Sequence, residues 1–115
     1  MRVERELMRG AGPVAVLQLL EHRDMYGYEL VEALDQRTNG VLAMGQSTLY
    51  PLLYNLESKR LIQARWRDAP NGRKRKYYGL TKRGATHLAA SKQQWRHLMG
   101  AMEGLGLLET GQGKQ

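Results

Sequence analysis

The sequence contains no cysteine, so neither a disulfide framework nor a thiolate metal site is available. It also contains no apolar run long enough to cross a membrane. Its first six residues mix acidic with basic side chains, which does not fit a secretory signal. We therefore expect a soluble, cytoplasmic protein.

Side chains typical of catalytic centres are scarce as well. The sequence has no nucleophile-elbow or phosphate-loop pattern, and its only imidazoles are those of His22, His87 and His97. His87 and His97 are ten residues apart in one predicted helix, and the rise of about 15 Å between them is too long for one metal ion. We expect no enzymatic activity, no metal site and no cofactor.

Positive charge, by contrast, is abundant. Eighteen Lys and Arg residues stand against eleven Asp and Glu residues, and the formal net charge is +7. A surplus of this size favours an anionic partner, either nucleic acid or a membrane surface. The length of 115 residues fits one domain, or one domain with an appended helix.

Three helices are predicted before residue 61, at 13 to about 21, 25 to about 36, and 46–60, each with apolar residues at helical spacing. Pro13 suits the first position of a helix, because its missing N–H is not needed there. Residues 1–12 end in Gly10-Ala11-Gly12, a run that disfavours helix. We therefore expect residues 1–12 to form an N-terminal arm that is partly disordered.

The third predicted helix has two different faces. Four leucines at helical spacing form an apolar stripe: Leu49, Leu52, Leu53 and Leu56. Hydroxyl, phenol and amide groups lie on the opposite side and along its edge: Ser47, Thr48, Tyr50, Tyr54, Asn55 and Ser58. Ser47 is a suitable N-cap. This arrangement fits a recognition helix in the DNA major groove, although an ordinary surface helix has the same pattern.

A basic hairpin is predicted after this helix. Residues 62–67 alternate in polarity, Pro70-Asn71-Gly72 supplies a turn, and residues 76–80 form the returning strand. Ten of the eighteen basic residues fall between positions 59 and 83, and Arg73-Lys74-Arg75-Lys76 follows the turn directly. This run would present four cations to a phosphate backbone; the alternative is a solvated loop. A membrane binder would instead carry its cations along a helix face.

The last helix is expected from Lys82 to about Gly104, with Thr81 as its N-cap. Five apolar residues follow a seven-residue repeat, in which Ser91 is the exception: Leu88, Trp95, Leu98, Met102 and Leu105. The helix therefore needs a partner, and two are open: a second copy of the chain or the first helix of the same chain. Glycines in the last residues predict a flexible tail at 107–115.

Three helices, a basic hairpin and a long last helix make a winged helix-turn-helix, mainly α with a small two-stranded β wing. The chain also resembles the PadR family of bacterial transcriptional regulators in four motifs. These are Tyr26-Gly27-Tyr28-Glu29-Leu30; Ser47 to Leu53 with Leu56-Glu57; Gly72-Arg73 with Lys76-Tyr77-Tyr78; and Leu80-Thr81 with Gly84. The resemblance implies a DNA-binding domain over residues 13–80 and a C-terminal dimerisation helix over 81–106.

The resemblance further implies a homodimeric repressor that binds a pseudo-palindromic operator in double-stranded DNA. Residues expected to contact DNA are Tyr26, Tyr28, Gln46, Ser47, Thr48, Tyr50, Tyr54, Arg73, Lys74, Arg75 and Lys76. Residues expected at the dimer interface are Leu88, Trp95, Leu98, Met102 and Leu105. Of Tyr77 and Tyr78, which point to opposite faces of a strand, at most one should reach DNA.

Two further questions stay open in the sequence. In some similar regulators a tryptophan at the place of Trp95 stacks against flat aromatic compounds that release DNA, but Trp95 is also suited simply to fill an interface, which is the interpretation that the sequence favours. The chain also departs from the family pattern at Asp24-Met25, where a Pro-containing turn is common, at Ser47, where Gly is common, and at Gly79, where a polar residue is usual. A winged helix that binds another protein through its last helix is the alternative function.

Overall fold

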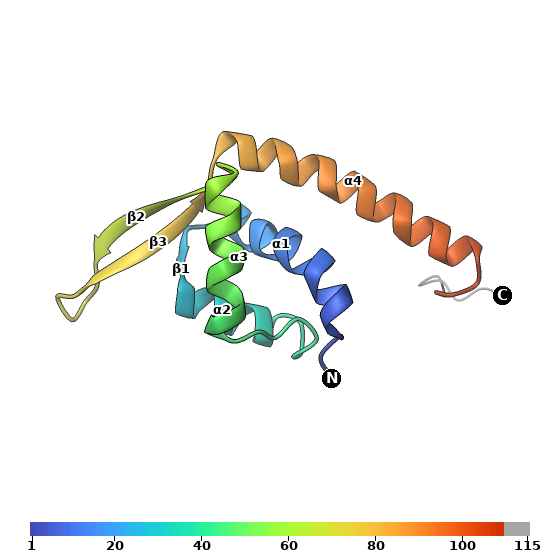
Figure 1. Cartoon of the computed structure of the whole chain (residues 1–115), viewed down its shortest axis with the longest axis horizontal. Coiled ribbons are helices and arrows are strands. Elements are labelled where there is room, and N and C mark those ends of the chain that lie inside the picture. Colours follow the sequence, from blue (N-terminus) through green and yellow to red (C-terminus); the bar gives the residue numbers. More distant parts are fainter. Residues whose placement is uncertain (110–115) are drawn as a thin grey trace.

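The computed structural model describes residues 1–109 and contains four helices and a three-stranded antiparallel sheet (Figure 1). The elements are α1 (Arg5–His22), β1 (Met25–Tyr26), α2 (Gly27–Gln36), α3 (Gln46–Ser58), β2 (Ile62–Asp68), β3 (Lys74–Leu80) and α4 (Lys82–Gly104). Helices α1 to α3 pack around one core, the hairpin of β2 and β3 projects to one side, and α4 extends to the other (Figure 1). The winged helix-turn-helix prediction is confirmed.

Helix α1 corrects the prediction for the first residues. It begins at Arg5 and continues through Gly10-Ala11-Gly12 and Pro13, so residues 1–12 are not a separate arm and Pro13 is not the first helical residue. Contacts with the rest of the chain hold this half in place. The Val3 N–H donates to the Val41 carbonyl at 3.0 Å, and Met8 packs against the core. Tertiary packing thus outweighs a weak local helix preference.

The core is built from leucines whose spacing the sequence displays. Side chains of α1, α2 and α3 that are less than 2% exposed include Leu17, Leu30, Leu34, Leu49 and Leu53. Leu56 is also buried and Leu52 is half-buried, so the apolar stripe of α3 faces the core as predicted. Leu88 of α4 is 1% exposed and belongs to the same core. It therefore has almost no surface to offer a second chain, which removes it from the expected dimer interface.

The sheet has one strand more than predicted. Met25 and Tyr26, expected at the start of the second helix, are extended and pair with Tyr78 and Tyr77 of β3, giving the strand order β1-β3-β2. Met25 is buried, whereas Tyr26 lies on the other face of the sheet and is only half-buried. A strand this short gives too little alternation to be recognised in a sequence.

Helix α3 begins one residue before the predicted cap. Gly45 is its N-cap, so Ser47 lies within the first turn and does not cap the helix. The helix ends at Ser58 rather than at Arg60, because Arg60 adopts a left-handed conformation with φ 62°. This residue turns the chain from α3 into β2, and the Leu61 N–H donates back to the Leu56 carbonyl at 3.0 Å. The helix and the wing are therefore joined by a tight connection.

The wing is a seven-residue ladder on each side, from the pair Ile62 and Leu80 at its base to the pair Asp68 and Lys74 near its tip. Gly72 makes the turn with φ 85°. Strand β3 begins at Lys74 rather than at Lys76. Of the four consecutive cations, only Arg73 lies in the turn, and the other three belong to the strand.

Helix α4 has the predicted bounds and the predicted cap, since the Thr81 hydroxyl accepts from the Gly84 N–H at 2.9 Å. Its first half packs on α1, where Lys92 Nζ lies 3.1 Å from Glu21 Oε1. Its second half projects from the body on the side opposite the wing (Figure 1), and the chain has extents of 57 × 30 × 24 Å. Of the predicted tail at 107–115, residues 110–115 lie outside the described residues. No helix within residues 1–109 is long and apolar enough to cross a membrane.

Candidate nucleic-acid interface

The outer face of α3 is open to solvent along its whole length. Gln46, Ser47 and Thr48 are exposed in the first turn, and Tyr54 is 75% exposed further along. Donors and acceptors of different geometry are thus available on one rigid helix. This is the side-chain chemistry that reads base edges in a major groove.

Tyr50 has a second role that the sequence did not indicate. Its hydroxyl lies against Gly27 at the start of α2, where any side chain would collide with it. The ring is still 43% exposed. Tyr50 therefore packs α3 onto α2 with one edge and presents the other to the exterior.

The two tyrosines at the start of α2 differ in their surroundings. Tyr28 is 54% exposed. Tyr26 is half-buried: its ring meets Tyr77 edge-on with centroids 5.4 Å apart, and the Arg75 guanidinium lies 4.5 Å from its centroid. Its backbone N–H donates to the Glu29 carboxylate at 3.2 Å, which fixes the first turn of α2. Of the two, Tyr28 has the more accessible side chain.

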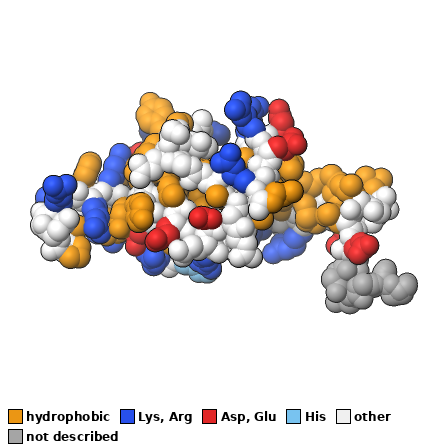
Figure 2. Space-filling view, turned by 90° about the horizontal axis from the view of Figure 1, so that it is seen from below, with side chains coloured by type: hydrophobic (Ala, Val, Ile, Leu, Met, Phe, Trp, Pro, Cys, Tyr) orange, Lys and Arg blue, Asp and Glu red, His pale blue; other side chains and the backbone are white. Residues whose placement is uncertain are grey.

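The wing cations are not equivalent. Lys74 Nζ lies 2.8 Å from Asp68 Oδ1, so its charge is locally compensated. Within residues 1–109, Arg73, Arg75 and Lys76 take part in no ion pair, although Arg75 and Lys76 lie over tyrosine rings. Figure 2 shows Lys and Arg side chains gathered over the wing and hydrophobic side chains along α4 at the opposite end. The wing is a concentrated source of positive potential.

Tyr77 and Tyr78 point to opposite faces of β3, as predicted. Tyr78 is 4% exposed and packs in the core, and Tyr77 lies half-buried on the outer face under the Arg67 guanidinium, 4.7 Å from its ring centroid. Burial raises the pKa of the Tyr78 phenol, and the nearby Tyr50 and Glu57 raise that pKa further. Tyr78 is a structural residue of the wing base.

Three residues of this surface were missed as functional candidates. Trp66, on β2 opposite Lys76, is 66% exposed because the wing extends beyond the core that its inner face covers at Ile62 and Ala64. Asp24, the residue before β1, forms an ion pair with Arg67 of the wing, with Oδ2 and Nη2 2.6 Å apart. The alternation of polarity in β2 could have indicated the exposed tryptophan. Nothing in the sequence indicates the ion pair, because its two residues are 43 positions apart.

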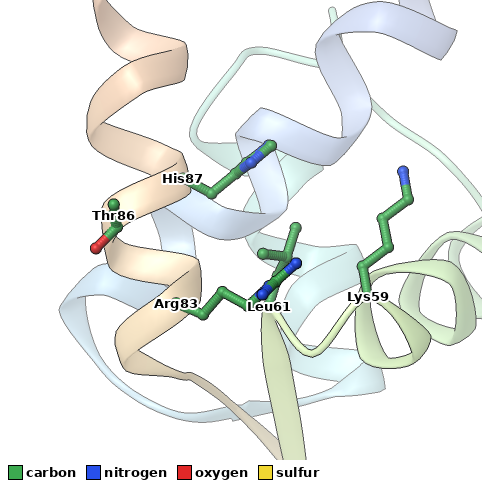
Figure 3. Close-up of a pocket in the computed structure, with 5 residues that line it drawn as sticks. All are labelled: Lys59, Leu61, Arg83, Thr86 and His87. Carbon is green, nitrogen blue, oxygen red and sulfur yellow. The ribbon is translucent and has the colours of Figure 1, made fainter.

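A second cationic region lies where α3, β2 and α4 meet. Lys59, Arg83 and His87 surround a hollow of about 500 Å³ whose wall includes Leu61 and Thr86 (Figure 3). It extends the positive surface from the wing base to the first turns of α4. No group of three or more His, Cys, Asp or Glu side chains among residues 1–109 is arranged to hold a metal ion.

Comparisons with known proteins agree with this geometry. The model of the Transcriptional regulator PadR-like family matches residues 16–90. A protein of Lysinibacillus sphaericus is 34% identical over 93 residues, which cover 81% of this chain and 85% of that protein. Transcriptional regulator YqjI of Escherichia coli K12 is 30% identical over 93 residues, but these cover only 43% of its length.

Solved structures give the same result over nearly the whole chain. A Streptococcus transcriptional regulator is 35% identical with a TM-score of 0.79, covering 90% of this chain and 99% of that one. A PadR family transcription regulator from Clostridium difficile is 32% identical with a TM-score of 0.73, covering 81% and 95%. Fold, surface and sequence similarity therefore lead to one assignment: the chain belongs to the PadR-like family of transcriptional regulators.

Proposed function

We propose that the protein is a sequence-specific DNA-binding regulator that acts as a homodimeric repressor on a pseudo-palindromic operator. One observation carries the proposal. The exposed polar face of α3 is joined by the tight turn at Arg60 to a wing whose cations Arg73, Arg75 and Lys76 take part in no ion pair within residues 1–109. A protein that only binds other proteins would not need such a wing.

In this proposal, α3 enters the major groove and the wing follows the phosphate backbone. Base-edge contacts come from Gln46, Ser47, Thr48 and Tyr54, with the exposed edge of Tyr50 beside them. Tyr28 and the wing cations contact phosphates and set the orientation of the protein on the duplex. Tyr26 and Lys74 have a smaller direct role, because each is engaged within the chain.

The proposed dimer forms through α4. Leu98 is 42% exposed and Leu105 is 81% exposed on its projecting half, with Trp95 and Met102 half-buried beside them. A groove of about 1050 Å³ between the N-terminal half of α1 and α3 has both apolar and charged side chains in its wall, and its apolar part at Met8 and Leu52 is available to a second chain, whereas Thr48 at its edge stays with the DNA-binding face. A second chain that covers these surfaces would remove their apolar side chains from water, which favours association.

In the proposed dimer, Trp95 can form part of a binding site for an effector. A planar aromatic compound can stack on its indole, and release of DNA requires that the compound bind the DNA-incompetent arrangement of the dimer more tightly than the competent one. The coupling would be about 1–3 kcal/mol. Filling of the interface by Trp95 alone is the simpler alternative.

The experiment that tests the proposed function is fluorescence anisotropy with labelled DNA. The purified protein is titrated onto the DNA upstream of its own gene and onto a scrambled duplex, each at two salt concentrations. Tight, salt-sensitive binding with preference for the native fragment is expected. If a folded, dimeric protein binds neither duplex, DNA regulation is wrong and a protein partner for α4 becomes the working hypothesis.

A further inference from the structure

The outer face of the sheet contains a connection that crosses all three strands. Met25 and Tyr26 of β1 pair with Tyr78 and Tyr77 of β3. Continuing this antiparallel register by one residue sets Asp24 across from Gly79. A Cβ on Gly79 would lie only 2.5 Å from Asp24 Oδ1, so the carboxylate occupies the space that a side chain would take. Two of the three positions at which the sequence departs from the expected family pattern, Asp24 and Gly79, thus lie against each other.

Arg67 reaches the same carboxylate from β2, the strand at the opposite edge of the sheet. Its Nη2 lies 2.6 Å from Asp24 Oδ2, and its guanidinium passes over the Tyr77 ring at 4.7 Å from the centroid. The side chain therefore bridges β3 and ties the outer strand of the wing to β1. We call the set of Asp24, Arg67 and Gly79 the wing latch.

The latch adds to two other contacts between β1 and the wing, the edge-on packing of Tyr26 against Tyr77 and the Arg75 guanidinium over the Tyr26 ring. Strand β1 contributes only two paired residues, whereas β2 and β3 extend seven residues each. The Asp24 and Arg67 side chains are 33% and 47% exposed, so water weakens the pair and it adds little to overall stability. What the pair can affect is the direction of the wing relative to β1 and α2, because it joins the outer strand of the wing to the residue before β1.

We propose that Asp24 and Arg67 are positioning residues that hold the wing so that Arg73 and Lys76 reach the DNA backbone while α3 lies in the groove. Arg67 is therefore engaged by Asp24 and is not itself a phosphate contact. Gly79 is required because only a residue without a side chain lets the carboxylate lie over β3. The inference rests on the proposed DNA-binding function.

The direction in which Asp24→Asn changes DNA affinity distinguishes a positioning role from a simple effect of charge. Asp24→Asn removes a negative charge close to a basic wing, and electrostatics alone would tighten DNA binding or leave it unchanged. Loss of the latch predicts the opposite, a weakening of about three- to tenfold. Binding of Asp24→Asn as tight as that of the unmodified protein, or tighter, would overturn the proposal.

A double-mutant cycle tests the pairing. Arg67→Met should weaken binding alone but add little in the Asp24→Asn background, and it should leave the salt slope unchanged. Arg73→Met is the matched control: it should weaken binding equally in both backgrounds and lower the slope by about 0.9. An additive effect of Arg67→Met, or a slope that falls as it does for Arg73→Met, would identify Arg67 as a phosphate contact instead.

Amide hydrogen exchange measures the latch without DNA. Asp24→Asn and Gly79→Ala should each speed exchange in β2 and β3 several-fold while exchange in the buried part of α1 stays unchanged. Unaltered exchange in the wing of both variants would overturn the latch even if the protein binds DNA. If the unmodified protein binds no DNA but its wing exchange rises in both variants, the latch stands as a structural device and only the proposed function fails.

Discussion

Leu88 is a core residue, although it lies on the same helix as residues expected at the dimer interface. It has the spacing of the apolar repeat in α4 but is 1% exposed within a single chain. Leu88→Ala should therefore lower the free energy of unfolding by about 2–5 kcal/mol, whatever the protein concentration. Urea denaturation measures this loss.

Leu98→Ala is the matched control for that measurement, since Leu98 is 42% exposed on the same helix. Its effect on the denaturation midpoint should depend on protein concentration, because we expect Leu98 to be covered only in the dimer. A Leu88→Ala variant with unchanged stability would place Leu88 outside the core.

Tyr78 gives a prediction for alkaline pH. Burial raises the pKa of its phenol above the ordinary value of 10.0, so the unfolded chain loses this proton before the folded chain does. The folded state then binds more protons, and stability falls as pH rises through that window. Tyr78→Phe removes this contribution, so the midpoint of urea denaturation should fall less steeply from about pH 9 to about pH 11 than in the unmodified protein.

The same comparison at about pH 7, where the Tyr78 phenol keeps its proton in the folded and the unfolded chain, gives the effect of removing the hydroxyl itself. Equal pH profiles for the Tyr78→Phe variant and the unmodified protein would mean that the phenol of Tyr78 is as accessible to water in the folded chain as in the unfolded one.

The first half of α1 offers a test of local helix preference. A Cβ at Gly10 would meet no atom within 4 Å, so Gly10→Ala should stabilise the fold by about 0.5–1 kcal/mol. Gly12→Ala should gain less, because its Cβ would lie 3.1 Å from Leu52 Cδ1. Thermal unfolding of both variants measures the difference. A lower melting temperature for Gly10→Ala would show that the glycine has a role beyond the helix.

The wing predicts a ranking among its cations. Arg73→Met and Lys76→Met should each lower the slope of log affinity against log salt by about 0.9, the effect of one lost phosphate contact. Lys74→Met should lower it less, because Lys74 is paired with Asp68 at 2.8 Å. Anisotropy titrations over several salt concentrations give the slopes. Equal effects at all three positions would mean that the ion pair opens when DNA binds.

These elements also show what a sequence can predict. The leucines of α3, the hairpin with its turn, and the Thr81 cap of α4 all depend on neighbours within a few residues, and all are confirmed. The helix predicted at 13–21 is present, but its start at Arg5 and the strand β1 were not predicted, because they depend on contacts far along the chain, such as Val3 with Val41 and Met25 with Tyr78. The pairing of Asp24 with Arg67 has the same long-range origin.

The shape of the whole chain supports the search for a second copy. Its radius of gyration is 16.0 Å, whereas a compact chain of this length would have about 13 Å. Both the wing and the second half of α4 project from the body (Figure 1), and the second half of α4 carries apolar side chains that one chain leaves in water. In an isolated monomer these apolar side chains stay in contact with water, which is unfavourable, whereas a dimer would bury them.

Trp95→Asp should accordingly shift the proposed dimer toward monomer, because it introduces a charge among side chains that association buries. Light scattering at several protein concentrations measures the molar mass. Gln94→Asp is the matched control, since it adds the same charge at a neighbouring exposed position. A Trp95→Asp variant that remains fully dimeric would exclude Trp95 from the interface.

The placement of the two tryptophans supplies built-in optical reporters. Trp66 is 66% exposed on the wing and Trp95 lies on α4, and the chain contains no others. The wavelength and the intensity of indole fluorescence change when the ring leaves water. A Trp95→Phe protein would therefore emit only from the wing, and a Trp66→Phe protein only from α4. Stopped-flow recordings of the two proteins would show whether the chains join before or after DNA reaches the wing, without any attached dye.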